Sequence, residues 1–393
     1  MKVNLLTKQL NCVILISHTH GSEKFDIFAG GAEIQVQKLI NFFTKYKKIK
    51  IHLITHFTKH ESKQNLRVTK IGNPKLPFFI AMILYILKTC FLLFKLNKTE
   101  KIDIIYSHMI GFACFPTIFA RKILKIPSLS KVSGKNTKVR EKKSSIYVLD
   151  KILRTIILNL RYIFIKNLDY FQVLNTDLKE ELSKIYRVKS EKIIKIPNGI
   201  EFKYTYSKNR INKIDTFGFV GRLEPVKNLP VLIRAFKKLK NRSSSNIFLS
   251  IYGIGAQKPF IEELIRQNQL EDNVFLKGFV SDIDKIYSNI DCFILPSKSE
   301  GVNNALLEAI SYGIPVIVSD IPSNRELIRH RKSGFLFDYT NANELSEFME
   351  ELMKNIELAQ KLTKTAYKDI KKKFSMNSIG KMLIHNFLQI INP

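Results

Sequence analysis

The chain has 393 residues, a length that suits two domains of ordinary size. Hydrophobic residues make up 45% of the sequence, which is enough to build packed cores and excludes global disorder. The net charge is +30, yet no helix-turn-helix, zinc-finger, RRM or KH pattern accompanies it, so we do not expect nucleic acid to be the partner.

The first half alternates between strand and helix patterns. Short runs of β-branched and apolar residues predict buried parallel strands at 11–18, 102–108, 169–175 and 192–200. The stretch 30–43 begins with two glycines and continues with apolar residues at helical spacing, so it predicts a helix.

Two longer apolar segments interrupt this alternation. Residues 76–96 have the length of a membrane span, but Lys88 lies inside them and a buried strand follows, which favours a core helix with an apolar outer face. Residues 146–171 repeat apolar side chains at helical spacing beside Lys and Arg. Such a basic amphipathic helix either lies in a membrane interface or packs against its own domain.

A second alternation begins after a polar stretch near residue 205. Two such series predict two doubly wound α/β sheets. The expected strands are 215–223, 246–253, 273–280, 291–297 and 315–320, and the expected helices are 229–239, 258–268 and a short one after Glu300.

Charge and cysteine usage bear on location. Residues 1–200 hold 36 Lys and Arg against 13 Asp and Glu, whereas residues 201–393 hold 28 against 21. The basic half suits an anionic membrane surface or a phosphorylated substrate, although a Lys-rich composition also keeps a surface solvated. The cysteines have neither metal-ligand nor disulfide spacing, which predicts a cytoplasmic protein without a signal peptide. They are Cys12, Cys90, Cys114 and Cys292.

Four charged residues follow predicted strands, three of them at a helix entrance and Glu308 inside the helix. Arg222 and Lys227 come after the strand at 215–223, where two cations and helix amide groups suit a diphosphate. Glu300 and Glu308 lie eight residues apart around the short helix that follows 291–297. Because ligands of open α/β sheets collect at the carboxyl ends of the strands, we expect a ligand site here.

These motifs, in this order and spacing, resemble the group 1 (family 4) retaining glycosyltransferases of the GT-B fold. The resemblance is specific over about 110 residues of the second half and weaker over 30–39, 102–109 and 196–200. The matching segments are "GRLEPVKN" (221–228), "SIYGIGAQ" (250–257), "LKGFVSDIDKIYSNIDCFILPS" (276–297), "SEGVNNALLEA" (299–309) and "GIPVIVSDIPSNREL" (313–327).

The resemblance implies an architecture. Two doubly wound Rossmann-like domains face each other across a cleft. Residues 1–205 form an acceptor-binding domain, residues 206–375 bind the nucleotide sugar, and residues 376–393 form a helix that crosses back to the first domain.

The resemblance also implies roles for individual residues. Arg222 and Lys227 bind the donor's diphosphate, Glu308 holds the ribose hydroxyls, and Glu300 contacts the transferred sugar. His108 lies near the reacting centre, although a histidine at a strand end is often structural. The implied catalytic set is His108, Arg222, Lys227 and Glu300. The implied donor-binding set is Gly30, Gly31, Arg222, Lys227, Gly253, Val280, Glu300, Gly301, Val302, Asn303, Asn304 and Glu308.

No metal or cofactor is expected. Growing negative charge on the leaving diphosphate is stabilised by the two cations and the helix amide groups. The "DID" at 282–284 looks like a metal motif, but it begins a helix, so we expect it to cap that helix. Asn303 departs from the Pro or Gly of many relatives, which leaves the identity of the sugar open.

The predicted function is transfer of a sugar, with retention, from a nucleotide-diphosphate sugar to a saccharide acceptor. We expect a polyprenyl-diphosphate-linked acceptor in bacterial capsule, O-antigen or lipopolysaccharide synthesis, and a peripheral enzyme on the inner face of the plasma membrane. Two alternatives remain open: a nucleotide-sugar epimerase of GT-B architecture, and a non-enzymatic polyanion-binding protein.

Overall fold

The chain forms two compact units. The computed structural model describes residues 8–16, 31–55, 62, 65–71, 78–108, 114–132, 162–202, 206–207, 211–301 and 303–392. Unit 1 comprises residues 1–199 and 376–393, and unit 2 comprises residues 200–375. The last helix, α13 (Met376–Ile391), therefore returns to the first unit.

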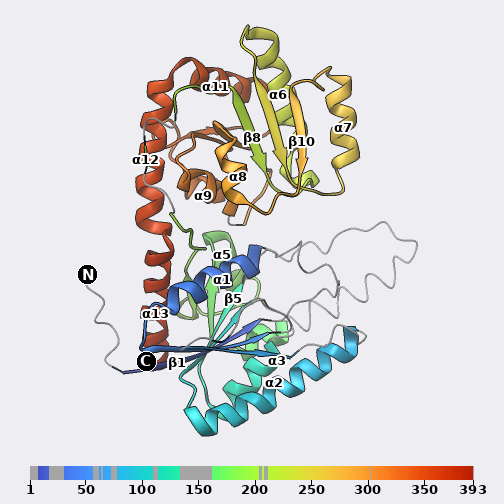
Figure 1. The fold of residues 1–393 in the computed structure, drawn as a ribbon. Helices are drawn as coiled ribbons and strands as arrows, with labels where there is room; N and C mark the ends of the chain where they lie inside the picture. Colours follow the sequence, from blue (N-terminus) through green and yellow to red (C-terminus); the bar gives the residue numbers. More distant parts are fainter. Residues whose placement is uncertain are drawn as a thin grey trace. The chain divides into compact units, whose positions relative to one another are not determined.

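Unit 1 contains a seven-stranded sheet with flanking helices (Figure 1). Its strands are all parallel, in the order β3-β2-β1-β4-β5-β6-β7. They are β1 (Leu10–Ile16), β2 (Ile49–Thr55), β3 (Leu66–Lys70), β4 (Ile104–His108), β5 (Ser128–Val132), β6 (Tyr170–Val173) and β7 (Ile193–Lys195). Besides α13 and a helical stretch at 162–167, the described residues of unit 1 form the helices α1 (Gly31–Phe43), α2 (Phe78–Glu100), α3 (Cys114–Phe119), the π-helical turn η1 (Ala120–Leu124), α5 (Thr176–Lys184) and the 3₁₀ turn η2 (Ser190–Lys192).

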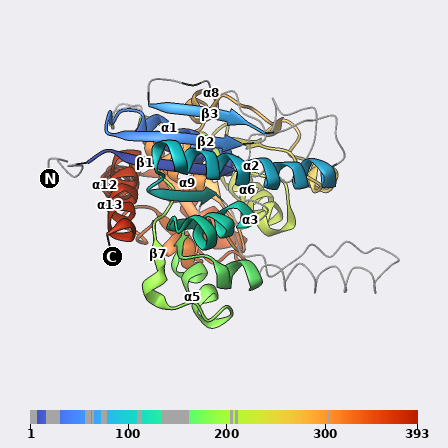
Figure 2. The same cartoon turned by 90° about the horizontal axis from the view of Figure 1, so that it is seen from below.

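The two faces of this sheet are covered by different helices. Alternate residues of the strands point to opposite faces of the sheet. The side chains on one face pack against α1 and α13, and those on the other face pack against α2 and η1 (Figures 1 and 2). Gly380 of α13 lies against Phe42 of α1, where an added Cβ would come within 2.1 Å of the ring. This close approach explains how the last helix seats on unit 1.

Unit 2 contains a six-stranded parallel sheet in the order β10-β9-β8-β11-β12-β13. The strands are β8 (Thr216–Val220), β9 (Phe248–Tyr252), β10 (Val274–Gly278), β11 (Cys292–Leu295), β12 (Val316–Ser319) and β13 (Phe335–Phe337). The helices are the 3₁₀ turn η4 (Pro225–Lys227), α6 (Leu229–Arg242), α7 (Lys258–Gln267), α8 (Ile283–Ser288), α9 (Asn304–Ser311), α10 (Pro322–Arg325), α11 (Ala342–Lys354) and α12 (Ile356–Phe374).

In each sheet the order of the strands changes direction once. In unit 1, β1 to β3 follow one another toward one edge of the sheet and β4 to β7 toward the other; in unit 2, β8 to β10 and β11 to β13 do the same. Such a switch point leaves a crevice at the carboxyl ends of two central strands, where ligands of doubly wound folds bind. The predicted pair of doubly wound sheets is confirmed, and each sheet has one such place.

The two apolar segments have different outcomes. Residues 78–100 form α2, which packs one face on the sheet as predicted for 76–96. By length and composition alone, Ile80–Glu100 is also the one described helix that could cross a membrane. Most of the segment 146–171 lies outside the described residues. Of it, residues 162–167 are helical, with Phe164 and Ile165 buried.

Candidate functional site

The carboxyl edge of the unit 2 sheet brings two predicted residues into contact. Lys227 follows β8 and Glu300 follows β11, the two strands at the switch point. The Lys227 ammonium donates to the Glu300 carboxylate over 2.5 Å, and the two side chains are only 15% and 10% exposed. A buried pair of this kind keeps both charges compensated, although 73 residues separate them in the chain.

The loop that carries Lys227 is anchored by its neighbours. Pro225 begins the turn η4, and Asn228 ends it in the left-handed conformation with φ of 53°. The Asn228 amide donates to the carbonyl oxygen of Tyr339 over 2.7 Å, and the Lys298 amide donates to the carbonyl of Val226 over 2.9 Å. The first bond ties the loop after β8 to the segment after β13, and the second ties it to the loop after β11, which positions Lys227 toward Glu300.

Arg222 is held less tightly than Lys227. Its guanidinium pairs with Glu224 over 2.6 Å, and the arginine side chain is 69% exposed. Because a guanidinium has five donors, this single pairing leaves donors of Arg222 free to meet an incoming anion. The predicted diphosphate cations therefore differ: one is buried and paired within the fold, and the other is exposed.

Two glycines let the loops after β8 and β9 touch. Gly253 has φ of +139°, and a Cβ there would lie 1.9 Å from the carbonyl oxygen of Gly221. A Cβ on Gly255 would lie 2.3 Å from the carbonyl oxygen of Leu223. The glycines of "IYGIGA" thus serve close backbone packing that fixes the Arg222 loop.

Glu308 lies on α9 and has a partner that the sequence did not single out. The hydroxyl of Tyr287, a residue of α8, is 3.2 Å from the Glu308 carboxylate and 3.0 Å from the carbonyl oxygen of Ala305. Burial, and then the charge of Glu308, raise the pKa of Tyr287 well above its usual value. Tyr287 therefore stays protonated, and its one hydroxyl proton is shared between the Ala305 carbonyl and the Glu308 carboxylate, which it helps to orient.

The start of α9 is only partly described. Gly301 precedes it, Asn304 is its first helical residue, and Val302 lies outside the described residues. Asn303 is 5% exposed, stands at the cap position without capping the helix, and its amide nitrogen has no partner among the described residues. Val280, after β10, is half-buried against the unit 2 core.

The "DID" segment caps a helix, as predicted. The carboxylate of Asp282 accepts from the amides of Asp284 and Lys285 at the start of α8. Asp284 accepts from the hydroxyl of Tyr312, at the end of α9. In the described part of the chain, no group of three or more His, Cys, Asp or Glu side chains is placed to hold a metal.

The carboxyl edge of the unit 1 sheet carries His108. It ends β4 and pairs in register with Ile16 of β1 and Lys131 of β5. His108 is 1% exposed, and its Nε2 has no hydrogen-bond partner among the described residues. Burial, and then the charge of Lys131, lower the pKa of His108 well below its usual value, so the imidazole is neutral. Gly31 begins α1 after β1, and Gly30 lies outside the described residues.

Lys131 is a candidate that sequence reasoning missed. Its ammonium is buried and donates to the Asn198 side chain over 2.8 Å. Burial lowers the pKa of Lys131 to about 7. The signal available in the sequence was its position at a strand end in "SLSKV", next to the predicted strand that ends at His108.

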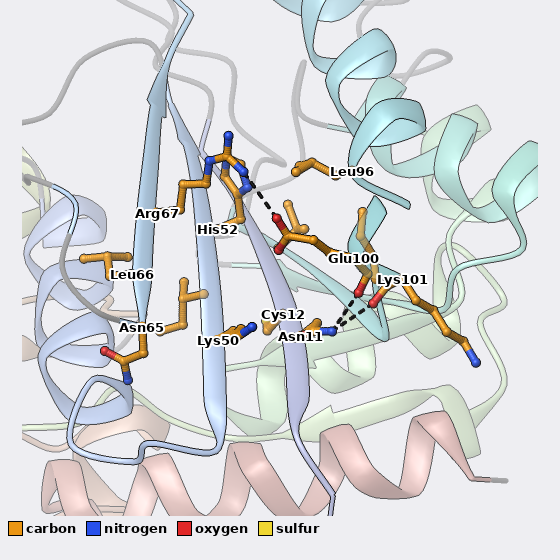
Figure 3. A pocket seen from close by; sticks show the side chains of 13 residues that line it. Asn11, Cys12, Lys50, His52, Asn65, Leu66, Arg67, Leu96, Glu100 and Lys101 are labelled. Atoms are coloured by element: carbon orange, nitrogen blue, oxygen red, sulfur yellow. Dashed lines mark hydrogen bonds and ion pairs between the residues drawn. The ribbon is translucent and has the colours of Figure 1, made fainter. Parts of the chain in front are cut away.

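A separate cavity of about 200 Å³ lies at the amino edge of the unit 1 sheet (Figure 3). Arg67 of β3 and Glu100 pair across it over 3.3 Å, and Asn11 donates to the carbonyl oxygens of Glu100 and Lys101. Burial, and then Arg67, lower the pKa of His52 in its wall to about 4. The cavity is at the opposite ends of the strands from His108 and contains none of the predicted site residues.

Comparison with known families covers most of the chain. Residues 29–204 match the family Glycosyltransferase Family 4, and residues 205–369 match the family Glycosyl transferases group 1. Over 68% of this chain and 70% of the relative, the sequence is 29% identical to UDP-Gal:alpha-D-GlcNAc-diphosphoundecaprenol alpha-1,3-galactosyltransferase of Escherichia coli. For three other curated relatives the matched stretch spans 57%, 38% and 62% of their lengths, about half on average.

Solved structures share the fold over nearly the whole chain. Sucrose-phosphate synthase of Thermosynechococcus elongatus superimposes with a TM-score of 0.76 at 16% identity, covering 98% of this chain and all of that one. HepE of Anabaena, in complex with UDP and glucose, superimposes with a TM-score of 0.71 at 16% identity, covering 97% of this chain and all of that one. The chain therefore belongs to the group 1, family 4 glycosyltransferases and has their GT-B fold.

Proposed function

We propose that the protein transfers a sugar, with retention of anomeric configuration, from a nucleotide-diphosphate sugar to a saccharide acceptor linked to a polyprenyl diphosphate. The observation that carries this proposal is the Lys227–Glu300 pair at the switch point of unit 2. The E. coli relative is named for transfer from UDP-galactose to a diphosphoundecaprenol-linked sugar, and the Anabaena structure contains UDP and glucose. Both names support a nucleotide-sugar donor, and the first also supports a lipid-linked acceptor.

The two cations would act on the leaving diphosphate. As the bond between sugar and phosphate breaks, negative charge grows on the diphosphate oxygens. Lys227 has three donors, so it can keep Glu300 and still donate to a phosphate oxygen. Arg222, mostly exposed, adds a planar fork that suits a phosphate. Fixed donors in a partly dry site stabilise this charge most in the transition state.

The two glutamates would hold the neutral parts of the donor. Glu300, fixed by Lys227, accepts from hydroxyls of the transferred sugar, and Glu308, fixed by Tyr287, accepts from the ribose hydroxyls. The backbone amide groups of Gly301, Asn303 and Asn304 lie at the amino end of α9, where they would donate to the nucleotide sugar. In this proposal neither glutamate is a nucleophile and no metal takes part.

His108 would act as a neutral group. Because burial and Lys131 lower its pKa, the imidazole can share a hydrogen bond with a sugar hydroxyl without bringing a charge to the reacting centre. We assign the acceptor to unit 1 and place the protein on the cytoplasmic face of the plasma membrane, in the synthesis of a bacterial surface polysaccharide. The excess of Lys and Arg in residues 1–200 supports a location beside anionic lipid.

The test begins with donor binding. We expect one of the UDP-, GDP- or dTDP-sugars to raise the melting temperature, because a ligand that binds only the folded state stabilises it. Incubation of that donor with a synthetic polyprenyl-diphosphate-linked sugar should yield a glycoside whose anomeric configuration matches the donor, in the presence of EDTA. Conversion of the donor to an isomer without acceptor would instead establish an epimerase, and absence of any donor effect would refute the proposal.

A further inference from the structure

The outer face of α2 carries a row of large apolar side chains that the protein leaves uncovered. Each of them is between 40% and 71% exposed, and Phe91 is the most exposed. Single exposed apolar residues are ordinary on protein surfaces, but a contiguous row marks a surface that contacts something apolar. We name the row the apolar stripe; it consists of Ile80, Ile83, Leu87, Phe91 and Phe94.

The orientation of the apolar stripe is fixed by the opposite face of the same helix. Tyr85, Thr89 and Leu93 are fully buried against unit 1, and the Tyr85 hydroxyl donates to the carbonyl oxygen of Ile16 over 3.2 Å. At 100° per residue, the five residues of the stripe fall within an arc of about 80° on the side away from the sheet. Figures 1 and 2 show α2 lying lengthwise on the outside of unit 1.

The surroundings of the stripe are cationic. Lys88 and Lys95 are exposed along one flank, and Lys98 continues the stripe with its ammonium 4.5 Å from the ring of Phe94. The neighbouring turn η1, which packs against α2, adds the exposed Lys122 and Ile123. Apolar side chains bordered by cations suit the headgroup boundary of an anionic bilayer.

We propose that the apolar stripe and its flanking lysines dock unit 1 on an anionic lipid surface, with α2 lying in the plane of the interface. A spanning orientation is excluded for the folded unit, because the buried face of α2 and its connection to β4 keep the helix on the sheet. This docking rests on the proposed function in one respect only: its role would be to hold the enzyme beside a lipid-linked acceptor.

A second copy of the chain is the competing occupant of this face. Charge argues against it, because pairing two stripes would bring Lys88, Lys95 and Lys98 of each copy close to those of the other. Like charges across an interface cost free energy, whereas anionic headgroups would compensate the same lysines. The observations therefore favour lipid.

The experiment is co-sedimentation of the full chain with vesicles. The vesicles contain either phosphatidylcholine alone or phosphatidylcholine with phosphatidylglycerol, each at low and at high salt. We expect binding to the anionic vesicles that weakens with salt. Replacing Leu87 and Phe91 together by Gln, a good helix former, should lower the partition coefficient by about tenfold or more. The matched control is Phe260→Gln, which removes a similarly exposed ring from α7 of unit 2 and should leave binding unchanged.

Three results would overturn the proposal. They are wild-type protein that ignores anionic vesicles, a Leu87→Gln/Phe91→Gln variant that binds as wild type does, and a wild type that self-associates through the stripe in sedimentation velocity while the variant is monomeric. Donor-induced thermal stabilisation of the variant in detergent should equal that of wild type. Vesicle binding without any glycosyl transfer would leave the docking surface standing and refute the proposed function alone.

Discussion

The carboxyl edges of the two sheets share one topology but handle charge in different ways. In unit 2, Lys227 and Glu300 meet as a compensated ion pair at the switch point between β8 and β11. In unit 1, the corresponding place between β1 and β4 ends in a buried, neutral His108 beside a lysine whose pKa is lowered to about 7. The unit 2 edge therefore pairs its buried lysine with a carboxylate, whereas the unit 1 edge holds a buried lysine that donates to the neutral side chain of Asn198.

The variant with the largest expected effect is Lys227→Ala, at the carboxyl edge of the unit 2 sheet. Loss of the ammonium removes a donor from the leaving diphosphate and leaves Glu300 as an uncompensated anion in the same place. We expect kcat/KM for transfer to fall by about 100- to 1,000-fold, the usual effect of removing one preorganised donor. Steady-state kinetics with the best nucleotide sugar measures this, and donor-induced thermal stabilisation should be lost as well.

Lys238→Ala is the matched control for this variant. Lys238 is an exposed lysine on α6, in the same unit, and its removal should change kcat/KM less than twofold, as expected for an isolated surface charge. A Lys227→Ala enzyme that retains full transfer would remove the ion pair from the mechanism and with it the basis of the proposed donor site.

The buried lysine at the unit 1 edge can be tested through pH. The pKa of Lys131 is lower in the folded state than in the unfolded chain. Between about pH 7 and the pKa of this lysine in the unfolded chain, the unfolded chain therefore binds more protons than the folded chain. Stability contributed by this group therefore rises with pH in that window. Lys131→Met should flatten the rise of apparent unfolding free energy between pH 7 and 8.5 by up to about 1.4 kcal/mol per pH unit.

Denaturant titrations of wild type, Lys131→Met and Lys238→Met across this range measure the effect. The surface variant should run parallel to wild type. The pKa of His108, followed by NMR, should rise in Lys131→Met, because the charge of Lys131 is the second cause that lowers it. Parallel stability curves for all three proteins would show that Lys131 is not buried as an uncompensated ammonium.

The strength and the limit of sequence reasoning are both visible at these edges. The central strands β1 and β11 were predictable because strands buried on both faces are nearly continuous apolar runs. The strand β5 was missed because three of its five residues are polar, namely Ser128, Ser130 and Lys131. Their partners, Asp169, Ser107 and Asn198, come from distant parts of the chain, and no local pattern reveals that such polar groups are satisfied inside a core.

The candidate site was predictable in its residue types but not in its contacts. Arg222, Lys227 and Glu300 stand out because each follows a strand and precedes a helix, and Glu308 because it lies one helix turn further on in α9. That Lys227 pairs with Glu300 depends on how the loop after β8 is tied to the loop after β11, where the Lys298 backbone amide donates to the carbonyl oxygen of Val226. That tie is a backbone hydrogen bond, which almost any residue could make, so the sequence carries no signal for it.

The variant with the smallest expected effect tests whether Tyr287 orients the carboxylate of Glu308 without changing its charge. Tyr287→Phe removes one hydroxyl that donates to the carboxylate and keeps the buried ring. A typical hydrogen bond contributes about 1 kcal/mol, so we expect donor affinity to fall by about fivefold with kcat nearly unchanged. Isothermal titration calorimetry with the donor measures the change in affinity, and steady-state kinetics measures the change in kcat.

Tyr206→Phe is the control for this variant. It removes a similar, partly buried hydrogen bond elsewhere in unit 2, which the Tyr206 hydroxyl donates to the carbonyl oxygen of Gln360. If both variants lose equal stability but only Tyr287→Phe loses donor affinity, the hydroxyl orients Glu308 toward the donor. If donor affinity is unchanged in Tyr287→Phe, the hydroxyl serves only the Ala305 carbonyl at the start of α9, and Glu308 needs no partner to hold the ribose.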